Sequence, residues 1–443
     1  MRSIPFMLSA AVLAAGALFL PAAQATVVAV PGDQTNLSSK ADKMISFRHQ
    51  KHSWVTADQQ FQLLYNTGST AGDALQLSTS PDGVTWTKKL TLANSDENSS
   101  ADGSLNGGLL SVVYSTANKG INFAPLKYDP STQSWKIKGP GQVVRDGKDK
   151  LKGKPAYVPS LVEDQSGNFW VVFLEQTVKS GQSSGPAVLR LYYRAKDAST
   201  WSDTGLAFHQ AADRPYDAPK LSARLVRTPD SIGMVIADGA DIWWAQRPAD
   251  AAWNGNWQAS QMLIQGTPDS EADVDPYASH FSTTTDDQGN IHLVYADAKT
   301  PYYRRFNALV SEGGPAWSQN SIAFSDTPLD TGYPEVSYLG GSSIAVVFNA
   351  HVEGKVSNLR VYQSASRGSS LQSFKCTHLL THEPAPDGNQ VQYQHMRNEM
   401  PAVAPAAGVP VLLQYQVPKN GAWNYKALNY SFPASTTPGC TAQ

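Results

Sequence analysis

The sequence predicts an all-β fold, a seven-bladed β-propeller of four-stranded antiparallel blades, from three observations. One hydrophobic phrase returns seven times: an apolar residue, one free position and three further apolar residues. Turns containing Asp and Gly precede copies of this phrase, and a Trp-bearing stretch ends each of the first five repeats. No stretch has the periodicity of an amphipathic helix of useful length. A strand-like phrase that recurs every 49 to 65 residues is typical of a closed array of small sheets.

Each repeat predicts four short strands in the same order. A loop leads into a first strand, often through a proline, and a turn then leads into the hydrophobic phrase, a third strand and the Trp-bearing stretch. The phrases are nearly uniform in apolarity, as expected for strands buried on both faces between stacked blades. The seven phrases are residues 61–65, 110–114, 169–173, 232–236, 291–295, 344–348 and 409–413.

The first 25 residues have the features of a cleaved secretory signal. Arg2 gives a positive start, residues 6–20 form a mostly apolar run without a charge, and Ala23-Gln24-Ala25 resembles a cleavage site. The run is too short to span a bilayer. The sequence therefore predicts a signal peptide over 1–25, a single propeller domain over 26–443, and a secreted or periplasmic protein without membrane insertion.

The ends of the mature chain are predicted to meet. The last repeat supplies three strands at most, and residues 26–30 form a short apolar strand with no repeat of its own. We expect this strand to complete blade seven, to close the ring and to remove an exposed edge. Only two cysteines exist, Cys376 and Cys440, and an oxidising compartment predicts a disulfide between them. Closing a loop of about 65 residues stabilises a fold by roughly 4 kcal/mol in the loop-entropy model.

Composition excludes several partners. The 35 basic and 37 acidic residues give a net charge of −2 without long runs of either sign, which disfavours nucleic acid and anionic membranes. Eleven Trp and eighteen Tyr suit a sheet-rich protein whose aromatic surfaces stack on sugar rings. No Gly-rich phosphate loop, Gly-x-Ser-x-Gly elbow or EF-hand spacing occurs. We therefore expect a monomer that needs no cofactor and has a glycan or polysaccharide as its partner.

Candidate functional residues lie in the loops that lead into the innermost strands, because these loops cluster at one mouth of the channel. An alignment of the innermost strands places Ser160, Lys220, His280 and Glu335 at one equivalent position. A purely structural ring would tend to fill such a position with similar residues. The diversity favours one glycan or small-ligand site at the mouth, and the alternative is undirected variation of a solvated surface.

The segment from Arg48 to His52 carries the most suggestive chemistry. His49 and His52 stand three residues apart beside aromatic and basic residues, where a histidine can act as general acid or base. A metal site would need further ligands that the sequence does not place, so no metal is predicted. An ordinary surface loop is the remaining interpretation. Acidic residues in neighbouring loops could supply a carboxylate pair for glycoside cleavage.

One hairpin carries a family resemblance. Ser80-Pro81-Asp82-Gly83-Val84-Thr85-Trp86 resembles the Asp-box hairpin of sialidase-like propellers, although it is one residue short between Asp82 and Gly83. Asp287-Gln288-Gly289-Asn290-Ile291-His292 is similar, and the whole mature chain looks like a member of the Asp-box (BNR) repeat group. That group includes sialidases, other glycosidases, polysaccharide lyases and lectins, so the resemblance implies a fold and leaves the activity open.

The resemblance implies two possible sets of catalytic residues. A sialidase would place Arg48, Arg224 and Arg397 on a carboxylate with Tyr333 as nucleophile, but the chain keeps only Phe47-Arg48 of the family's Phe/Tyr-Arg-Ile-Pro motif. Seven-bladed lyases use His and Tyr for proton transfer, with Arg neutralising a uronate.

We predict a hydrolase or lyase with one site, or alternatively a non-catalytic glycan-binding propeller. The predicted catalytic residues are His49, His52, Tyr216, Arg224 and His280, and the predicted substrate-binding residues are Arg48, Lys220, Tyr277, Tyr333, Glu335 and Arg397.

Overall fold

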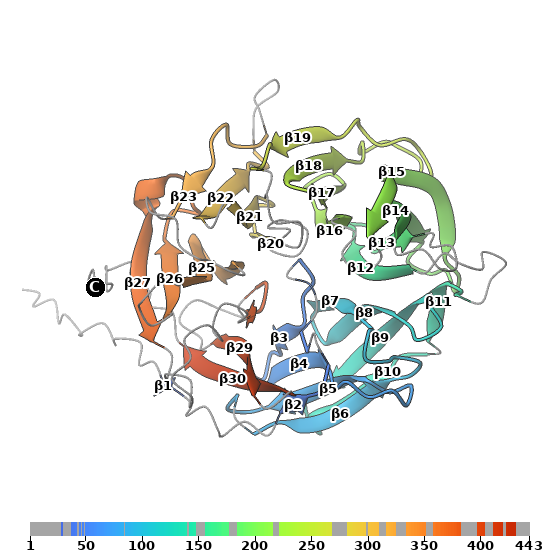
Figure 1. The fold of residues 1–443 in the computed structure, drawn as a ribbon, viewed down its shortest axis with the longest axis horizontal. Helices are drawn as coiled ribbons and strands as arrows, with labels where there is room; N and C mark the ends of the chain where they lie inside the picture. The colour runs from blue at the N-terminus through green and yellow to red at the C-terminus, as the bar shows by residue number, and fades with distance from the viewer. Residues whose placement is uncertain are drawn as a thin grey trace, which may run out of the picture.

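The computed structural model is an all-β propeller whose antiparallel sheets are arranged around a central axis (Figure 1). Within the described part of the chain, no helix is long and apolar enough to cross a membrane. The structure describes residues 28–29, 37–41, 44–45, 47, 49–83, 85–139, 141–147, 156–176, 184–215, 221–267, 281–297, 300–309, 316–324, 334–350, 358–381, 397–403, 411–419 and 422–430.

Six sheets are regular blades, in which consecutive strands pair antiparallel and the first strand lies nearest the axis (Figure 1). Five of them have four strands, and the second blade has five, because β10 and β11 both pair with β9. Blades one to three are β3 (Ser53–Val55), β4 (Phe61–Asn66), β5 (Leu75–Ser80) and β6 (Thr87–Leu92); β7 (Ala101–Asn106), β8 (Leu109–Ser115), β9 (Ile121–Asp129), β10 (Ser134–Ile137) and β11 (Gln142–Arg145); and β12 (Ala156–Glu163), β13 (Phe169–Gln176), β14 (Ser184–Arg194) and β15 (Ser202–Pro215).

Blades four to six continue the same pattern, with one short 3-10 helix before the last strand of blade six. They are β16 (Leu221–Arg227), β17 (Ile232–Asp238), β18 (Asp241–Gln246) and β19 (Gln261–Ile264); β20 (Phe281–Thr285), β21 (Ile291–Asp297), β22 (Thr300–Phe306) and β23 (Ile322–Ala323); and β24 (Glu335–Gly340), β25 (Ser343–Ala350), β26 (Asn358–Ser364), the 3-10 helix η1 (Leu371–Ser373) and β27 (Phe374–Thr381).

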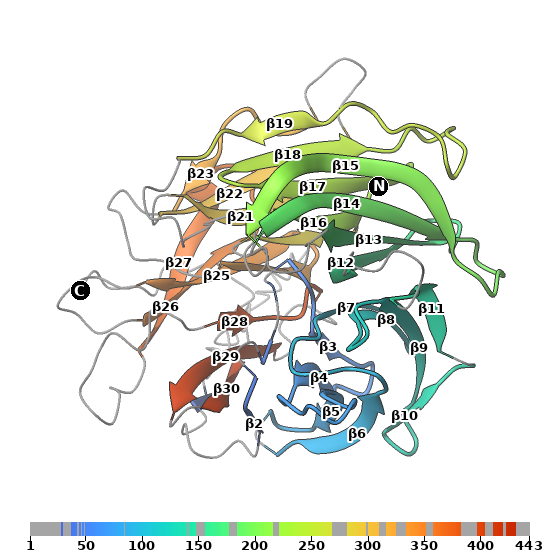
Figure 2. The same ribbon diagram turned by 45° about the vertical axis from the view of Figure 1, so that its right-hand side comes forward.

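The remaining strands form an irregular terminal sheet from both ends of the chain. Its order is β1-β30-β29-β28, and β2 also pairs with β30; Figure 2 shows β28 beside β29. The first strand, β1, pairs through only two residue pairs, Val28 with Asn429 and Ala29 with Leu428. These strands are β1 (Val28–Ala29), β2 (Ser38–Ser39), β28 (Arg397–Glu399), β29 (Val411–Lys419) and β30 (Ala422–Tyr430).

The prediction of seven alike four-stranded blades closed by an N-terminal strand is therefore wrong. The structure has six regular blades, one of them five-stranded, and the seventh sheet is a composite of the two chain ends. Of the predicted closing strand 26–30, only Val28 and Ala29 belong to the described residues, and a ring-closing strand of that length is not observed. The hydrophobic phrase gave a wrong blade count because it marks only one strand of each sheet. It specifies neither the number nor the length of the strands that pair with that strand.

The phrases themselves are correctly placed on second strands. In blades one to six they fall within β4, β8, β13, β17, β21 and β25, and every residue of β13 is buried. Alternate residues of β13 serve two cores: Trp170, Val172 and Leu174 pack toward blade four, whereas its other face packs toward blade two. Each fully buried large apolar side chain contributes about 1.5–3 kcal/mol. Burial on both faces explains why the phrase does not alternate.

The hairpin between β5 and β6 has the hydrogen bonds that its sequence suggests. Ser80 Oγ accepts from the backbone of Gly83 at 2.8 Å, and Asp82 Oδ1 accepts from the backbone of Thr85 at 2.8 Å. The Trp86 indole donates to the Gly83 carbonyl at 3.0 Å and is buried. Gly83 has a φ of +77°, which a side chain would disfavour. The turn is therefore a local structural unit that fixes the register of this outer hairpin.

Gly233 shows how tightly the blade interface is packed. A Cβ atom at this position of β17 would lie 1.9 Å from the indole of Trp244, which packs edge-on to Trp317. We expect Gly233→Ala to lower the free energy of unfolding by about 1–3 kcal/mol, since overpacking forces the indole from its position. Gly141→Ala is the matched control, because no atom lies within 4 Å of its Cβ position. Equal urea midpoints for the two variants would contradict this packing.

Candidate functional site

One position in each regular blade carries a polar residue that faces the axis. In blades two to six this residue is the strand partner of the fourth residue of the hydrophobic phrase. In blade one the fourth residue of the phrase, Leu64, donates its backbone N–H to the carbonyl of His52. All six residues at this position are buried. They are His52, Asp102, Ser160, Arg224, Ser282 and Glu335.

The predicted alignment of this position was right for Ser160 and Glu335 and wrong for the other two blades. Arg224 and Ser282 occupy the positions that were assigned to Lys220 and His280, which lie outside the described residues. The strands are entered at different depths: Pro159 and Pro334 directly precede Ser160 and Glu335, whereas Pro219 lies five residues before Arg224.

A segment of blade one, residues 49–52, lies against several blades at the axis, and we call it the axial segment. The Gln50 amide donates to the Pro159 carbonyl of blade three at 2.8 Å. The Lys51 carbonyl accepts from the backbone of Gly103 in blade two at 3.2 Å. His49 stacks on Phe281 of blade five, with ring centroids 5.1 Å apart and an interplanar angle of 10°. The axial segment therefore links blade one to blades two, three and five.

Lys51 forms a buried ion pair across the axis. Its Nζ lies 2.7 Å from Glu335 Oε2 of blade six and 2.7 Å from Ser282 Oγ of blade five. Ser282 Oγ in turn donates to Glu335 Oε2 at 2.9 Å. The side chains of Lys51 and Glu335 are 1% and 0% exposed. A charge pair this deep is tolerated only because it is well paired and hydrogen-bonded.

Asp102 is the second charged centre. Its Oδ1 accepts from the backbone of Lys51 at 2.8 Å and from the guanidinium of Arg224, with which it forms an ion pair. Its Oδ2 accepts from the backbone of Leu161 in blade three at 2.8 Å. One carboxylate thereby joins blades two, three and four to the axial segment.

A strained turn in blade three brings backbone groups to the axis. Val158 has a φ of +53°, a left-handed conformation that β-branched residues strongly disfavour, at a register shift in β12. The next residue, Pro159, presents its carbonyl to Gln50, and Ser160 Oγ accepts from the backbone of Leu225 at 3.1 Å. The bulge re-aims these two residues toward neighbouring chain segments.

His49 has an unusual electrostatic position. Burial lowers the pKa of His49 well below its ordinary 6.5, and the nearby Arg224, His52 and Lys51 lower it further. Neither ring nitrogen has a hydrogen-bond partner among the described residues. The His49 ring is therefore neutral at physiological pH. The charged groups that act on it are cations.

The structure brings together four of the predicted site residues: His49, His52, Arg224 and Glu335. They converge at the axis as buried groups, where the sequence had placed them at an open mouth. Their catalytic and binding roles stay predictions. Arg397 lies in β28, and its side chain is not described. The predicted site residues outside the described part of the chain are Arg48, Tyr216, Lys220, Tyr277, His280 and Tyr333. Cys440 also lies outside it, so the disulfide between Cys376 and Cys440 stays a prediction.

The sequence missed three axial residues: Lys51, Asp102 and Ser282. An alignment on the hydrophobic phrase, rather than on prolines, would have found Asp102 and Ser282, because both pair with its fourth residue. Lys51 gives no such signal, since its partner Glu335 is 284 positions away. Within the described residues, no group of three or more His, Cys, Asp or Glu side chains is placed to hold a metal ion.

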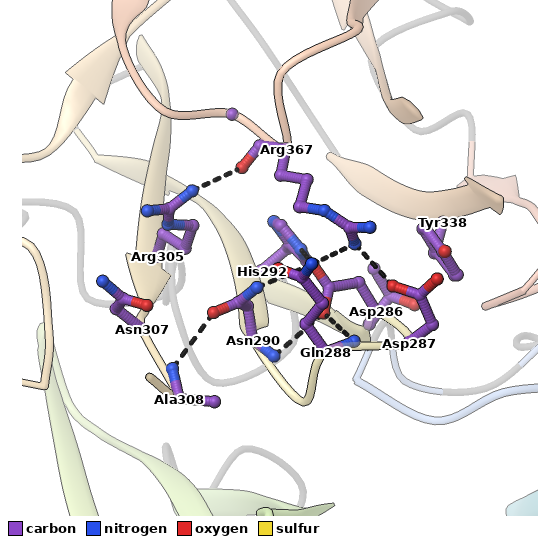
Figure 3. Close-up of polar contacts among 12 residues, drawn as sticks. Asp286, Asp287, Gln288, Asn290, His292, Arg305, Asn307, Ala308, Tyr338 and Arg367 are labelled. Atoms are coloured by element: carbon purple, nitrogen blue, oxygen red, sulfur yellow. Dashed lines mark hydrogen bonds and ion pairs between the residues drawn. The ribbon is translucent and has the colours of Figure 1, made fainter. Parts of the chain in front are cut away.

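A second polar cluster lies at the other end of β20, and we call it the clasp (Figure 3). Asp286 Oδ1 accepts from the backbones of Gln288 and Asn290 at 2.9 and 3.0 Å, which shapes the turn between β20 and β21. Its Oδ2 accepts from Asn290 Nδ2 at 2.9 Å and lies 3.3 Å from His292 Nε2. Although burial favours the protonated acid, the hydrogen bonds hold the pKa of Asp286 below its ordinary value.

The clasp joins blade five to blade six through Arg367. In Figure 3 its guanidinium lies between the two acidic residues, 2.9 Å from Asp286 Oδ2 and 2.7 Å from Asp287 Oδ1. The Arg367 carbonyl accepts from Arg305 Nη1 of blade five at 3.1 Å. The next residue, Gly368, has a φ of +63°, and a Cβ there would lie 2.2 Å from the Tyr303 hydroxyl. Only glycine fits this approach.

Comparisons with known proteins leave the family of the chain open. No protein-family model matches the chain, and no curated protein sequence matches it significantly. An ulvan lyase from a new family of polysaccharide lyase, bound to -[GlcA(1-4)Rha3S]-, is 10% identical over 89% of this chain and 96% of its own, with a TM-score of 0.49.

Two further solved structures resemble the chain. *Trypanosoma rangeli* sialidase is 11% identical over 77% of this chain and 58% of its own, with a TM-score of 0.41. *Penicillium chrysogenum* α-L-arabinanase, complexed with arabinobiose, is 13% identical over 76% and 98%, with a TM-score of 0.41. These neighbours are carbohydrate-related, but likenesses this weak do not carry their activities over to this chain.

Proposed function

We propose that this protein is an exported, carbohydrate-active propeller with one asymmetric site at its axis, acting on a polysaccharide by elimination or hydrolysis. The observation that carries the proposal is the axial position, where six blades contribute six residues of differing charge and hydrogen-bonding character, with only serine repeated. A ring that served packing alone would not need a cation, two carboxylates and a histidine at one register. A multivalent binder would repeat one sugar site in several blades.

Elimination fits the axial residues better than hydrolysis does. Glycoside hydrolysis needs two carboxyl groups in separate roles, one of them protonated. Here Asp102 and Glu335 each form an ion pair, with Arg224 and Lys51 respectively. A neutral histidine is ready to accept a proton, and neighbouring cations can neutralise the carboxylate of a uronate while the adjacent carbon loses its proton. His49 and Arg224 have these two properties.

Binding without catalysis is the second candidate, and one observation favours it. His49 is fully buried, so a substrate reaches it only if the chain that covers it moves. If it does not move, the axial charges hold the blades together and recognition falls to residues at the surface. Measured products decide between the two.

The test is incubation of the protein with a panel of acidic and neutral polysaccharides. Elimination produces a new double bond that absorbs in the ultraviolet, and hydrolysis produces reducing ends without that absorbance. We expect His49→Gln to lower kcat on an active substrate by about 100-fold or more. His209→Gln is the control, because His209 lies on the outermost strand β15 and contacts Asp238. No product from any polymer, together with retention on a glycan array, would leave only the binding function.

A further inference from the structure

Three nitrogen atoms at the axis lack the partners that buried polar atoms require. They are Nδ1 and Nε2 of His49 and Nε of Arg224, and none has a hydrogen-bond partner among the described residues. Both side chains belong to the axial cluster: the Arg224 guanidinium and the backbone of Lys51, two residues after His49, donate to the same oxygen of Asp102. The three atoms therefore need an explanation in the same region of the molecule.

A bound water molecule or ion is the ordinary explanation for such atoms. The charges favour an anion. The two axial carboxylates are already engaged, Asp102 by Arg224 and two backbone amides and Glu335 by Lys51 and Ser282. Arg224, His52 and Lys51 all make the potential at His49 more positive.

We propose that the axis holds a monovalent anion, a halide or a carboxylate, bound between the His49 ring and Nε of Arg224. Arg224 Nε–H is a donor only, and the protonated imidazole offers two further N–H donors. The anion accepts from Arg224 Nε–H and from one of the two imidazole N–H groups, because these two N–H groups point away from each other, and a proton taken up by His49 balances its charge. Phe281 stacks on the face of the ring and holds the imidazole in place.

Anion binding and proton binding at His49 reinforce one another. Without the anion, burial and the cations keep the pKa of His49 low, so the folded state loses stability as pH falls below about 6.5, where the unfolded chain takes up the proton. The groups that face the ring from its own segment are His52 and Lys51, and from β16 Arg224. An anion offsets their field, raises the pKa of His49 and reduces the loss of stability in acid.

The same chemistry has two sources, a free halide or the carboxylate of an acidic sugar. The anion site does not depend on the proposed catalytic activity, because its readouts are stability and ion density. If an acidic sugar fills it, the substrate of the proposed function is a polymer that carries carboxylates, and the protonated His49 binds the carboxylate and is not the base of the elimination. Bromide and glucuronate are the probes that separate the two sources.

The test measures thermal unfolding of the full protein with sodium bromide or sodium glucuronate, at pH 7 and at about pH 5.5. A probe at ten times its Kd is expected to raise the Tm by about 2 °C, and by more at the lower pH. His49→Phe keeps the stacking on Phe281 and removes both nitrogens, so it should lose this response. Arg224→Lys keeps the charge beside Asp102 and removes Nε, so it should weaken the response. His209→Phe is the control that retains it.

Crystals soaked in bromide give a direct readout through anomalous scattering. A peak within hydrogen-bond distance of His49 and Arg224 Nε, or a Tm response to either probe that depends on His49, supports the anion site. A response to glucuronate alone assigns the site to an acidic sugar. Equal responses in the wild type and His49→Phe, with no anomalous peak at the axis, would overturn the proposal.

Discussion

Replacing Lys51 with Met is expected to lower the free energy of unfolding by about 3–5 kcal/mol. The substitution removes the Lys51 ammonium, which lies 2.7 Å from Glu335 Oε2. The fully buried Glu335 carboxylate then loses this counter-ion. A buried charge without compensation is among the most destabilising changes known for a single residue. Urea unfolding with an unchanged m-value measures the effect as a fall in midpoint.

A double variant separates the lost charge pair from lost packing. Lys51→Met combined with Glu335→Gln removes both charges, so we expect it to recover about 2 kcal/mol of the loss. Lys136→Met is the control, since Lys136 is exposed on β10 and its replacement should change stability by no more than about 0.5 kcal/mol. If the double variant is as unstable as Lys51→Met, the ion pair is not the cause.

The regular blades could be predicted from the sequence because their signal is local. The phrase at 169–173 is apolar throughout since β13 is buried against two neighbouring blades, and this demand recurs in every regular blade. The terminal sheet could not be predicted in the same way. Its strands β1 and β2 are two residues each, and such short segments carry no periodicity. Their position depends on where the two chain ends meet.

The axial cluster was predictable only in part. Glu335 and Ser160 were placed at their position because a proline precedes each of them at the same distance. Arg224 was predicted as a site residue, but its register was not, because Pro219 lies five residues before it and not directly before it. The partnership of Arg367 with Asp286 spans 81 positions and depends on two turns meeting between blades, which no local pattern records.

The second large effect is expected at the clasp, where Asp286→Asn should lower the free energy of unfolding by about 2–4 kcal/mol. The amide nitrogen of Asn cannot accept, so it would face the donors of Asn290 or Arg367 in a buried site. The pairing with His292 also fails. Because burial lowers the pKa of His292, its ring is neutral, with Nδ1 2.7 Å from the Tyr303 hydroxyl and Nε2–H directed at Asp286.

The matched control is Asp164→Asn in blade three. Asp164 makes the same turn, accepting from the backbones of Ser166 and Asn168 and from the Trp170 indole. It is only partly buried, and no cation among the described residues pairs with it. Its replacement should therefore cost less than that of Asp286, by about 1 kcal/mol or more. Equal losses would show that the turn, and not the link to blade six, carries the stability.

The pH dependence of the clasp variant provides an independent check. Burial opposes ionisation of Asp286, but His292, Asn290 and Arg367 together hold its pKa below the ordinary 3.8. A carboxylate with a lowered pKa stabilises the fold above its unfolded pKa, and this contribution is lost as pH falls below about 4. The wild type should therefore lose part of its advantage over Asp286→Asn between pH 7 and about pH 3. Urea midpoints at the two pH values measure this convergence, and a gap that stays constant would mean that the ionised carboxylate is not what holds blades five and six together.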